Sequence, residues 1–472
     1  MTRTTRTQRR TLVWMRNDLR VADNPALAAA AERGSVVAVY LGAPAQWSAH
    51  GVGVNRRAFL LRTLADLSKA LNALNIPLLV RSVGRFADHP AAIVRLANAC
   101  GADAVMCNEE YPLDERRRDD AARDRCGDAG IEFRRFSGGV VLAPGQVLTG
   151  DGKPYTVFTP FKRRWLAIVD DGLLQPIEAP RRQAKVDVES DVLPKRLGGA
   201  SADRLADLWP GGETEAMRRL DAFVARGLSR YHVDRDRPDR DGTSRLSPYL
   251  AVGAISARQC IAAARARNGG QLGSGDIGAT TWISELIWRE FYAHVTAAFP
   301  DVSRGRAFRP ANDRVRWRDD PAGLAAWREG RTGYPLVDAA MRQLAGTGWM
   351  HNRLRMLTAM FLTKHLLIDW RQGERHFMDL LVDGDFAANN GGWQWSASTG
   401  TDAAPYFRIF NPVTQAKKFD PDGVFVRRWV PELASTPKPA IFEPWHDGGI
   451  PGYPAPIVDH ASARERALGA WR

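Results

Sequence analysis

Residues 282–292 combine two tryptophans, a carboxylate and a guanidinium group at helical spacing. On a helix, Trp282, Glu285 and Arg289 lie on one face, at positions i, i+3 and i+7. Trp288 and Tyr292 lie beside them. A carboxylate between two tryptophans can hydrogen-bond a flat heterocycle against which the rings stack. The alternative is an ordinary amphipathic helix with an ion pair between Glu285 and Arg289.

Residues 243–247 place three hydroxyl groups and an arginine within five positions, just before a helix-like run. They are Thr243, Ser244, Arg245, Leu246 and Ser247. The free N–H groups and the dipole at a helix N-terminus both favour phosphate. Taken alone, a helix cap with a solvated arginine is the simpler interpretation.

Two later segments mix amides, acids and tryptophans. Residues 348–356 hold Asn352 and Met356 one turn apart, and Arg353 adds a fork suited to phosphate. Residues 383–395 contain two acids, two asparagines, three glycines and two tryptophans. We expect this second segment to be a backbone-rich loop closing on a polar ring system. A glycine-rich connector is the less favoured alternative, because a connector would give the two tryptophans little to do. An EF-hand is excluded, because the spacing of the carboxylates does not fit one.

The elements that must position these groups divide the chain. The first 145 residues alternate expected strands at 11–15, 36–41, 78–82, 104–107 and 131–136 with helical patterns at 23–33, 56–74, 90–99 and 114–128. This alternation predicts a Rossmann-like α/β domain with a mostly parallel sheet. No Gly-x-Gly-x-x-Gly follows the first strand, so the standard dinucleotide fingerprint is missing there.

The pattern then changes twice. Prolines punctuate residues 146–210, which predicts a linker with some local helix. After 210 the expected elements are helices at 213–226, 257–267, 281–298, 321–329, 334–345, 352–370 and 374–381. We therefore predict an α/β plus all-α protein: a basic arm (1–10), an α/β domain (11–145), a linker (146–210) and an all-helical domain (211–472). Its last forty residues are expected to be loop-like with a short terminal helix.

The chain is strongly basic, because 66 Lys and Arg against 53 Asp and Glu give a net charge of +13. This excess favours a polyanionic partner, although an arginine-rich protein without one is equally open on charge alone. The cysteines form no C-x-x-C pair, so neither a zinc site nor a disulfide framework is expected, and reduced thiols in a cytosol fit best. We expect no signal peptide and no membrane span.

In these motifs, the chain resembles the class I cyclobutane pyrimidine dimer photolyases of the photolyase/cryptochrome family. The resemblance runs from residues 13–20, VWMRNDLR, to Gln415, and it is most specific over 332–410. It implies an enzyme that repairs UV-damaged DNA with light. Reduced FAD, once excited, gives an electron to a flipped-out dimer, the cyclobutane bonds split, and the electron returns.

The resemblance implies one FAD, folded in a U inside the helical domain. The cofactor-binding positions it implies are Tyr231, Thr243, Ser244, Arg245, Leu246, Ser247, Trp282, Arg289, Asp383, Gly384, Asp385 and Asn389. The first six would hold the phosphates, and Trp282 and Arg289 would line the pocket. Asp383 and Asp385 would contact the adenosine and isoalloxazine sides. Asn389 would face the flavin N5 and favour the reduced form.

The resemblance also implies a set of positions that contact the lesion and the damaged strand. They are Arg235, Glu285, Trp288, Asn352, Arg353, Met356, Trp395, Arg408 and Gln415. The arginines would grip phosphates and make binding salt-dependent. Glu285 would stabilise the reduced dimer through a hydrogen bond. Flipping the lesion out costs a few kcal/mol, and least for a damaged base.

Three tryptophans match the family's electron-transfer chain, in the order Trp317 to Trp370 to Trp393 from the surface to oxidised flavin. The alternative for each residue is an ordinary tryptophan of the hydrophobic core. Because all three positions match the family, this alternative is the weaker interpretation.

The family often holds a light-harvesting antenna in the N-terminal domain. Residues 111–116 resemble its folate-binding segment, with Asp114 and Glu115 as the implied contacts. Asp114 stands where the family often has asparagine, and Ser303 and Arg304 also depart from the common pattern. Methenyltetrahydrofolate is the favoured antenna, with a deazaflavin or no antenna left open.

Three other functions compete with repair of cyclobutane dimers: a cryptochrome, a photolyase for six-four photoproducts, and a light-independent DNA-binding protein. Met356 and Trp395 favour the cyclobutane dimer, because relatives in the other classes commonly carry His or Tyr there. The last alternative explains the charge but not the flavin pocket. We expect a monomer in the bacterial cytoplasm.

Overall fold

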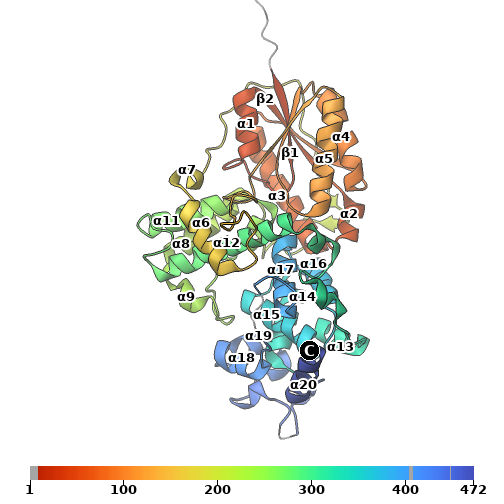
Figure 1. Cartoon of the computed structure of the whole chain (residues 1–472), viewed down its shortest axis with the longest axis vertical. Coiled ribbons are helices and arrows are strands. Elements are labelled where there is room, and N and C mark those ends of the chain that lie inside the picture. The colour runs from red at the N-terminus through yellow and green to blue at the C-terminus, as the bar shows by residue number, and fades with distance from the viewer. Residues whose placement is uncertain (1–8, 403–407, 447, 472) are drawn as a thin grey trace, which may run out of the picture.

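A five-stranded parallel sheet forms one end of the molecule, and helices form the rest (Figure 1). The computed structural model describes residues 9–402, 408–446 and 448–471. The strand order is β3-β2-β1-β4-β5. The strands are β1 Arg10–Met15, β2 Ser35–Gly42, β3 Leu78–Ser82, β4 Ala104–Asn108 and β5 Glu132–Phe136. The predicted parallel α/β fold is confirmed. Of the expected basic arm, residues 1–8 lie outside the described part, and Arg10 already belongs to β1.

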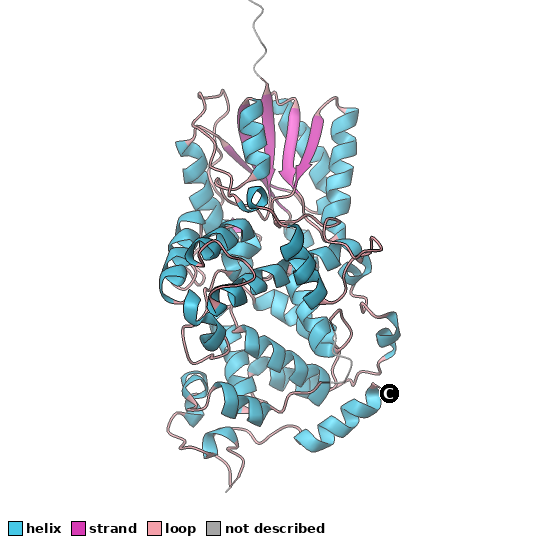
Figure 2. Ribbon diagram, turned by 60° about the vertical axis from the view of Figure 1, so that its left-hand side comes forward, coloured by secondary structure: helices cyan, strands magenta, loops and turns pink. Residues whose placement is uncertain are grey.

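Both faces of the sheet are covered by helices, as Figure 2 shows. Val13 and Met15 of β1 pack into the core on the side of α1 and α3, whereas Leu12 and Trp14 pack on the side of α4 and α5. These strands are therefore buried on both sides, which explains their continuous apolar runs. The helices of this region are α1 Pro25–Arg33, α2 Pro44–Ala49, α3 Val54–Ala73, α4 His89–Ala99 and α5 Leu113–Asp128.

The segment between the two regions contains two helices, where some local helix was expected, and a short strand pair that was not predicted. They are α6 Phe158–Ile168, α7 Asp171–Leu174 and the antiparallel pair β6 Arg196–Leu197 and β7 Ala200–Ser201. Helix α6 packs against α12 of the helical region. Part of this segment therefore packs on the helical region.

From residue 202 onward, the described part of the chain contains helices, turns and loops but no strand. The first helices are α8 Glu213–Arg226, α9 Tyr231–Asp234, α10 Ser247–Val252, α11 Ala257–Arg267, α12 Ile277–Ala298, α13 Pro321–Glu329 and α14 Pro335–Thr347. The later ones are α15 Asn352–Met360, α16 Trp370–Leu380, α17 Phe386–Ala397, α18 Pro412–Phe419, α19 Val424–Trp429 and α20 His460–Ala470. The predicted bounds of α8, α11 and α13 match the structure. In the described residues, no helix has both the length and the apolar character that crossing a membrane would require.

The single helix predicted over 352–370 is wrong, because two helices meet there. Helix α15 ends at Met360, a π-helical turn covers Phe361–His365, and Leu367 has a left-handed φ of 54°. A new helix, α16, then starts at Trp370, and the side chain of Asp369 accepts a hydrogen bond from the N–H of Arg371 at 3.0 Å. Asp369 is a typical N-cap residue and marks the start of a new helix, but the helical periodicity that continues across it suggested a single helix.

The loop predicted over 383–395 is also wrong, because most of it is helix α17. Asp385 caps this helix by accepting a hydrogen bond from the N–H of Ala388 at 3.0 Å. A Cβ on Gly391 would lie 2.1 Å from a ring carbon of Tyr292 on α12. Glycine in this helix therefore serves close packing between α12 and α17 and not the flexibility of a loop.

Candidate active site

A cavity of about 510 Å³ opens among α9, α10, α12, α15 and α17. This volume lies in the range of small-molecule sites, about 300–1,000 Å³. It brings together predicted positions from five separate parts of the sequence: Tyr231, Arg235, Thr243, Ser244, Arg245, Leu246, Ser247, Trp282, Glu285, Trp288, Arg289, Asn352, Arg353, Met356, Asp383, Asp385 and Trp395.

The remaining predicted positions lie around this cavity. Asn389 and Trp393 line a smaller cavity of about 130 Å³, which shares Asn352, Asp383 and Asp385 with the larger one. Arg408 places its guanidinium 5.9 Å from the ring centroid of Trp395. The others line neither cavity: Gly384, Gln415 on α18, Trp370 at the start of α16, and Trp317 before α13.

Helix α12 supplies the aromatic wall. Its N-terminus is capped by Asp276, and Trp282 is almost fully buried against Phe223 of α8. The ring of Trp288 stacks on Phe158 of α6, with centroids 3.7 Å apart and planes 11° apart. One face of Trp288 is thus fixed by a residue of the segment between the two regions, which holds the ring in place beside the cavity.

Glu285 and Arg289 do not behave as the ordinary helical ion pair. The Oε1 atom of Glu285 lies 2.7 Å from Nη1 of Arg235. Arg289 donates to the backbone oxygens of Gly139 at 2.8 Å and Leu250 at 3.3 Å, and it lies 3.8 Å from Asp385. Each side chain is therefore held by a partner distant in sequence. Because the two do not pair with each other, they can line different parts of the cavity.

The hydroxyl-rich segment forms a turn in front of α10. Arg245 has a left-handed φ of 50°, and its guanidinium lies 3.0 Å from Asp241. The Oγ atom of Ser247 accepts a hydrogen bond from the indole of Trp349 at 3.2 Å. The expected side-chain cap is not observed: Leu246 occupies the N-cap position of α10 and makes no side-chain hydrogen bond there. The hydroxyls of Thr243 and Ser244 instead line the cavity.

The hydrogen bonding of Asp383 indicates that the cavity suits a polar heterocycle. Its Oδ2 atom accepts a hydrogen bond from Arg355 at 2.7 Å. Its Oδ1 atom is buried and has no hydrogen-bond partner among the described residues. A buried carboxylate oxygen without a partner is costly, and a ligand N–H or O–H in the cavity would satisfy it. Together with the stacking walls and the hydroxyl turn, this residue set fits a flavin nucleotide.

A buried acid lies behind the predicted flavin-facing amide. Asn389 donates to the backbone oxygen of Glu374 at 3.2 Å, and Asn390 donates to its carboxylate at 2.8 Å. Burial raises the pKa of Glu374 to about 7, although the hydrogen bond from Asn390 opposes this. Glu374 was not predicted from the sequence, and its contact with Asn390 spans two helices.

The pKa of Glu374 predicts a pH-dependent stability. The folded protein holds this proton up to about pH 7, whereas an unfolded chain releases it near the ordinary glutamate pKa of about 4.3. Unfolding therefore releases a proton between these values, and this carboxyl makes the fold less stable as pH rises towards 7. We expect Glu374→Gln, which keeps a neutral acceptor for Asn390, to raise the melting temperature at pH 8 but not at pH 5. An equal change at both pH values would contradict the assignment.

Of the three predicted electron-transfer tryptophans, Trp393 lines the smaller cavity. Trp393 and Trp370 are buried, and Trp317 is partly exposed. A Cβ on Gly373 would lie 2.1 Å from the ring of Trp393, so only glycine leaves room for this ring between α16 and α17. The N–H of Arg318 donates to the backbone oxygen of Leu367 at 2.7 Å, which ties the segment of Trp317 to the start of α16.

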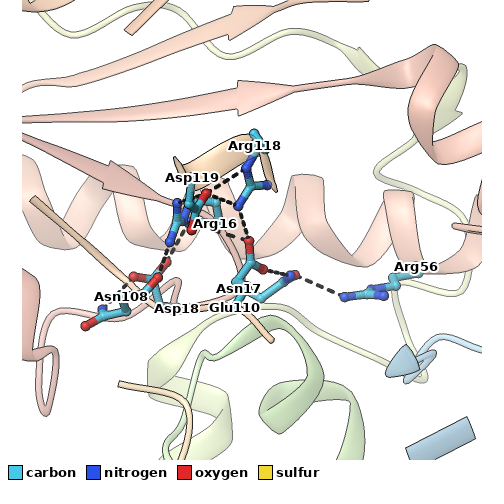
Figure 3. Close-up of polar contacts among 8 residues, drawn as sticks. All are labelled: Arg16, Asn17, Asp18, Arg56, Asn108, Glu110, Arg118 and Asp119. Atoms are coloured by element: carbon cyan, nitrogen blue, oxygen red, sulfur yellow. Dashed lines mark hydrogen bonds and ion pairs between the residues drawn. The ribbon is translucent and has the colours of Figure 1, made fainter. Parts of the chain in front are cut away.

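A network of polar contacts links Arg16 and its neighbours, at the carboxyl end of β1, to Arg56 (Figure 3). The strand order reverses between β1 and β4, and the carboxyl ends of these strands form the crevice where open α/β sheets usually bind ligands. Here the crevice is filled by the chain's own side chains: Arg16, Asn17, Asp18, Asn108, Glu110, Arg118 and Asp119. Burial opposes ionisation of Glu110, but Arg118 and Arg16 hold its pKa at about 2.

Arg56 of α3 joins this network to the cavity. Its Nη2 donates to Asn17 at 3.0 Å and to the backbone oxygen of Ala251 on α10 at 3.3 Å. Its Nη1 donates to the backbone oxygen of Gly384, between the two acids of the site. Arg56 was missed by the sequence analysis, because no local pattern shows that it contacts a segment more than 300 residues away.

We expect Arg56→Met to weaken flavin retention. Losing these donors leaves the Gly384 oxygen unpaired and loosens Asp383 and Asp385, at a cost of about 1–1.5 kcal/mol or roughly tenfold in affinity. The measurement is the FAD dissociation constant of the purified protein. Arg57→Met is the matched control, because Arg57 donates to Gly198 of the segment between the two regions. Equal losses in both variants would show a general effect of removing an arginine from α3.

The predicted antenna contacts lie at the first turn of α5. The carboxylate of Asp114 is 3.4 Å from Nε2 of His50. Burial, together with the neighbouring Glu110, raises the pKa of Glu115 to about 7. A cavity of about 360 Å³ lies beside this turn, but its lining includes Arg116 and Tyr111 and neither Asp114 nor Glu115. The two predicted contacts therefore do not line that cavity.

Two family models match the chain. The family described as "DNA photolyase" matches residues 11–181, and "FAD binding domain of DNA photolyase" matches residues 282–472. The chain is 46% identical over 470 residues to a deoxyribodipyrimidine photo-lyase of Vibrio cholerae, covering 98% of this chain and 99% of that one. It is 45% identical over 470 residues to the corresponding protein of Escherichia coli, covering 98% of each.

Solved structures agree with these sequence matches. A class III photolyase from Agrobacterium tumefaciens superimposes with a TM-score of 0.90 at 38% identity, covering 99% of this chain and 98% of that one. A cryptochrome from Synechocystis superimposes with a TM-score of 0.85 at 28% identity, covering 98% and 99%. The greater identity is thus to the proteins named photo-lyase or photolyase, and the lower identity is to the cryptochrome.

Proposed function

The chain belongs to the photolyase/cryptochrome family, with the deoxyribodipyrimidine photo-lyases, and from that premise we propose which of its side chains carry out light-driven repair of pyrimidine dimers in DNA. The observation that carries the proposal is the cavity itself. It joins a flavin-compatible polar wall, centred on Asp383, to an aromatic and acidic mouth with Glu285 and Trp288.

FAD, when bound, supplies the electron on absorbing light, as is general for cofactor-dependent photochemistry in which the protein orients and tunes the cofactor. We assign its phosphates to Tyr231 and the turn of residues 243–247. Asp383 and Asp385 accept hydrogen bonds from the ring systems, with Arg355 and Arg289 fixing their orientation. Asn389 presents its amide to the flavin, held by the backbone of Glu374.

The dimer occupies the mouth of the cavity. Trp288 and Trp395 flank it, Met356 and Asn352 lie one turn apart on α15 beneath it, and the carboxylate of Glu285 accepts a hydrogen bond from a ring N–H of the damaged bases. This assignment is supported by the lining of a single cavity by all five residues. Arg353, Arg408 and Gln415 hold the strand around the flipped-out lesion, and Arg235 adds its positive charge next to the damaged strand. Such phosphate contacts fix register without reading sequence.

Trp317, Trp370 and Trp393 carry electrons inward to restore the reduced cofactor. Trp317 is partly exposed whereas Trp370 and Trp393 are both buried, and this supports Trp317 as the outer end of the chain. Because repair would need the bound FAD in its reduced form, these three tryptophans would maintain activity and would take no direct part in splitting the dimer.

We propose a monomer that works in a reducing cytoplasm and carries a folate-type antenna near Asp114 and Glu115. The four thiols are free and buried, which suits a reducing compartment. The domain division at 11–145, 146–210 and 211–472 remains our proposal as well. The packing of α6 on α12 supports counting the middle segment with the helical region when truncations are designed.

The deciding experiment is a repair assay. The purified protein is reduced, mixed with an oligonucleotide containing a thymine dimer, and illuminated with blue or near-ultraviolet light. Flavin absorption bands together with light-dependent recovery of thymine absorbance are expected. Flavin bands without repair would favour a cryptochrome-like photoreceptor, and absence of flavin would overturn the cavity assignment.

A further inference from the structure

Four charged side chains form a connected rim at the mouth of the cavity, which we call the rim quartet: Glu285, Arg235, Asp236 and Arg353. Glu285 lies 2.7 Å from Arg235, whose Nε lies 3.9 Å from Asp236. The same oxygen of Asp236 accepts two hydrogen bonds from Arg353, at 2.7 and 3.2 Å. Two positive and two negative charges cancel, so the rim is neutral in the DNA-free protein.

Asp236 therefore competes with DNA for Arg353. A backbone phosphate can take the guanidinium only if Asp236 lets it go. The side chain of Asp236 is 34% exposed and that of Arg353 is 21% exposed. Ion pairs this exposed contribute little stability and exchange partners readily. Arg353 is also packed against the ring of Phe419, with its guanidinium 4.7 Å from the centroid, so the arginine stays in place whichever anion it holds.

We propose that Asp236 is a specificity-determining residue that hands Arg353 to a DNA phosphate only when a lesion engages Glu285. This rests on the proposed function of Glu285 and Arg353. A dimer that hydrogen-bonds Glu285 displaces Arg235, whose next carboxylate is Asp236. As Asp236 turns to Arg235, Arg353 is released to the phosphate. Undamaged DNA leaves Glu285 with Arg235 and Asp236 with Arg353, and so meets a neutral rim.

This exchange of partners by Arg353, which we call the handover, would let the protein discriminate damaged from undamaged DNA, because the two kinds of DNA would meet different charges at the rim quartet. Affinity for damaged DNA gains a phosphate contact that undamaged DNA does not obtain, and Asp236 adds repulsion against the undamaged backbone. Removing Asp236 frees Arg353 permanently. The undamaged duplex then gains the contact without any lesion.

The test is Asp236→Asn in the FAD-loaded protein, with binding measured in the dark. We expect affinity for an undamaged duplex to rise about 3–10-fold near 0.1 M salt, and affinity for the same duplex with one dimer to change less than about twofold. The salt dependence for undamaged DNA should steepen by about one phosphate contact. Asp239→Asn is the matched control, because it makes the same charge change but releases Arg237, which it holds at 2.7 Å. An equal rise for both duplexes in Asp236→Asn, as general charge predicts, would overturn the proposal.

Arg353→Gln separates failure of this inference from failure of the proposed function. If Arg353→Gln leaves binding of the dimer duplex unchanged, the assigned role of Arg353 is wrong and the handover falls with it. If Arg353→Gln weakens that binding but Asp236→Asn leaves the damaged-to-undamaged ratio unchanged, only the handover is wrong. In the double variant, the effect of Asp236→Asn on undamaged DNA should vanish. Flavin absorbance and melting temperature, expected unchanged in Asp236→Asn, show that each variant is folded.

Discussion

Trp393→Phe is expected to abolish photoreduction of the bound oxidised flavin while leaving repair by the chemically reduced enzyme intact. Trp393 lines the smaller cavity beside Asn389 and packs against Phe377 of α16, with ring centroids 4.9 Å apart. Phenylalanine keeps the packing but is far harder to oxidise. We expect the rate of photoreduction to fall on the order of a hundredfold, since each factor of ten corresponds to about 1.4 kcal/mol in the barrier.

The measurement is flavin absorbance under blue light with an exogenous thiol as the final donor. Trp14→Phe is the matched control, because Trp14 is also fully buried and its indole nitrogen, like that of Trp393, has no hydrogen-bond partner among the described residues. The stability cost in both should stay below the about 3–5 kcal/mol of truncation to alanine. Photoreduction that survives in Trp393→Phe but not in Trp14→Phe would place the electron route elsewhere.

The fold could be predicted where local signals agree with tertiary packing. The helix at 321–329 was predicted with the observed bounds, because Pro321 opens it and Gly330, with a left-handed φ of 63°, closes it. Helix α17 was missed for the opposite reason. Its glycines look like loop residues in the sequence, and only the position of Tyr292 on another helix explains why glycine is needed there.

The site shows the same division. The lining of the cavity was predicted because motifs at 243–247, 282–292, 348–356 and 383–395 each contribute whole groups of residues to it. Its supporting contacts were not predicted. The pairing of Glu285 with Arg235 and the reach of Arg56 to Gly384 depend on how distant segments meet, which no single-sequence pattern records. The local alternative, an ion pair between Glu285 and Arg289, was reasonable from spacing and did not form.

Glu285→Ala is expected to keep FAD and to lose much of the repair yield. Glu285 sits on the wall of the cavity that carries Trp282 and Trp288, and its known partner in the DNA-free protein is Arg235 rather than any flavin-holding residue. A charge-assisted hydrogen bond to the reduced dimer is worth about 1.5–3 kcal/mol, or about 10–100-fold in the rate of bond splitting. The measurement is the repair quantum yield of the reduced enzyme at saturating dimer, with flavin content checked by absorbance.

Glu285→Gln distinguishes a hydrogen bond from a charge. Glutamine is nearly isosteric and can still accept a hydrogen bond from a ring N–H of the dimer through its amide oxygen, so it should retain more repair than alanine. Both substitutions free Arg235 from its carboxylate, so a defect caused only by the released arginine would be equal in the two variants. A yield that is unchanged in Glu285→Ala would remove this residue from the chemistry. A yield that falls equally in both would assign the effect to the charge of the rim and not to contact with the dimer.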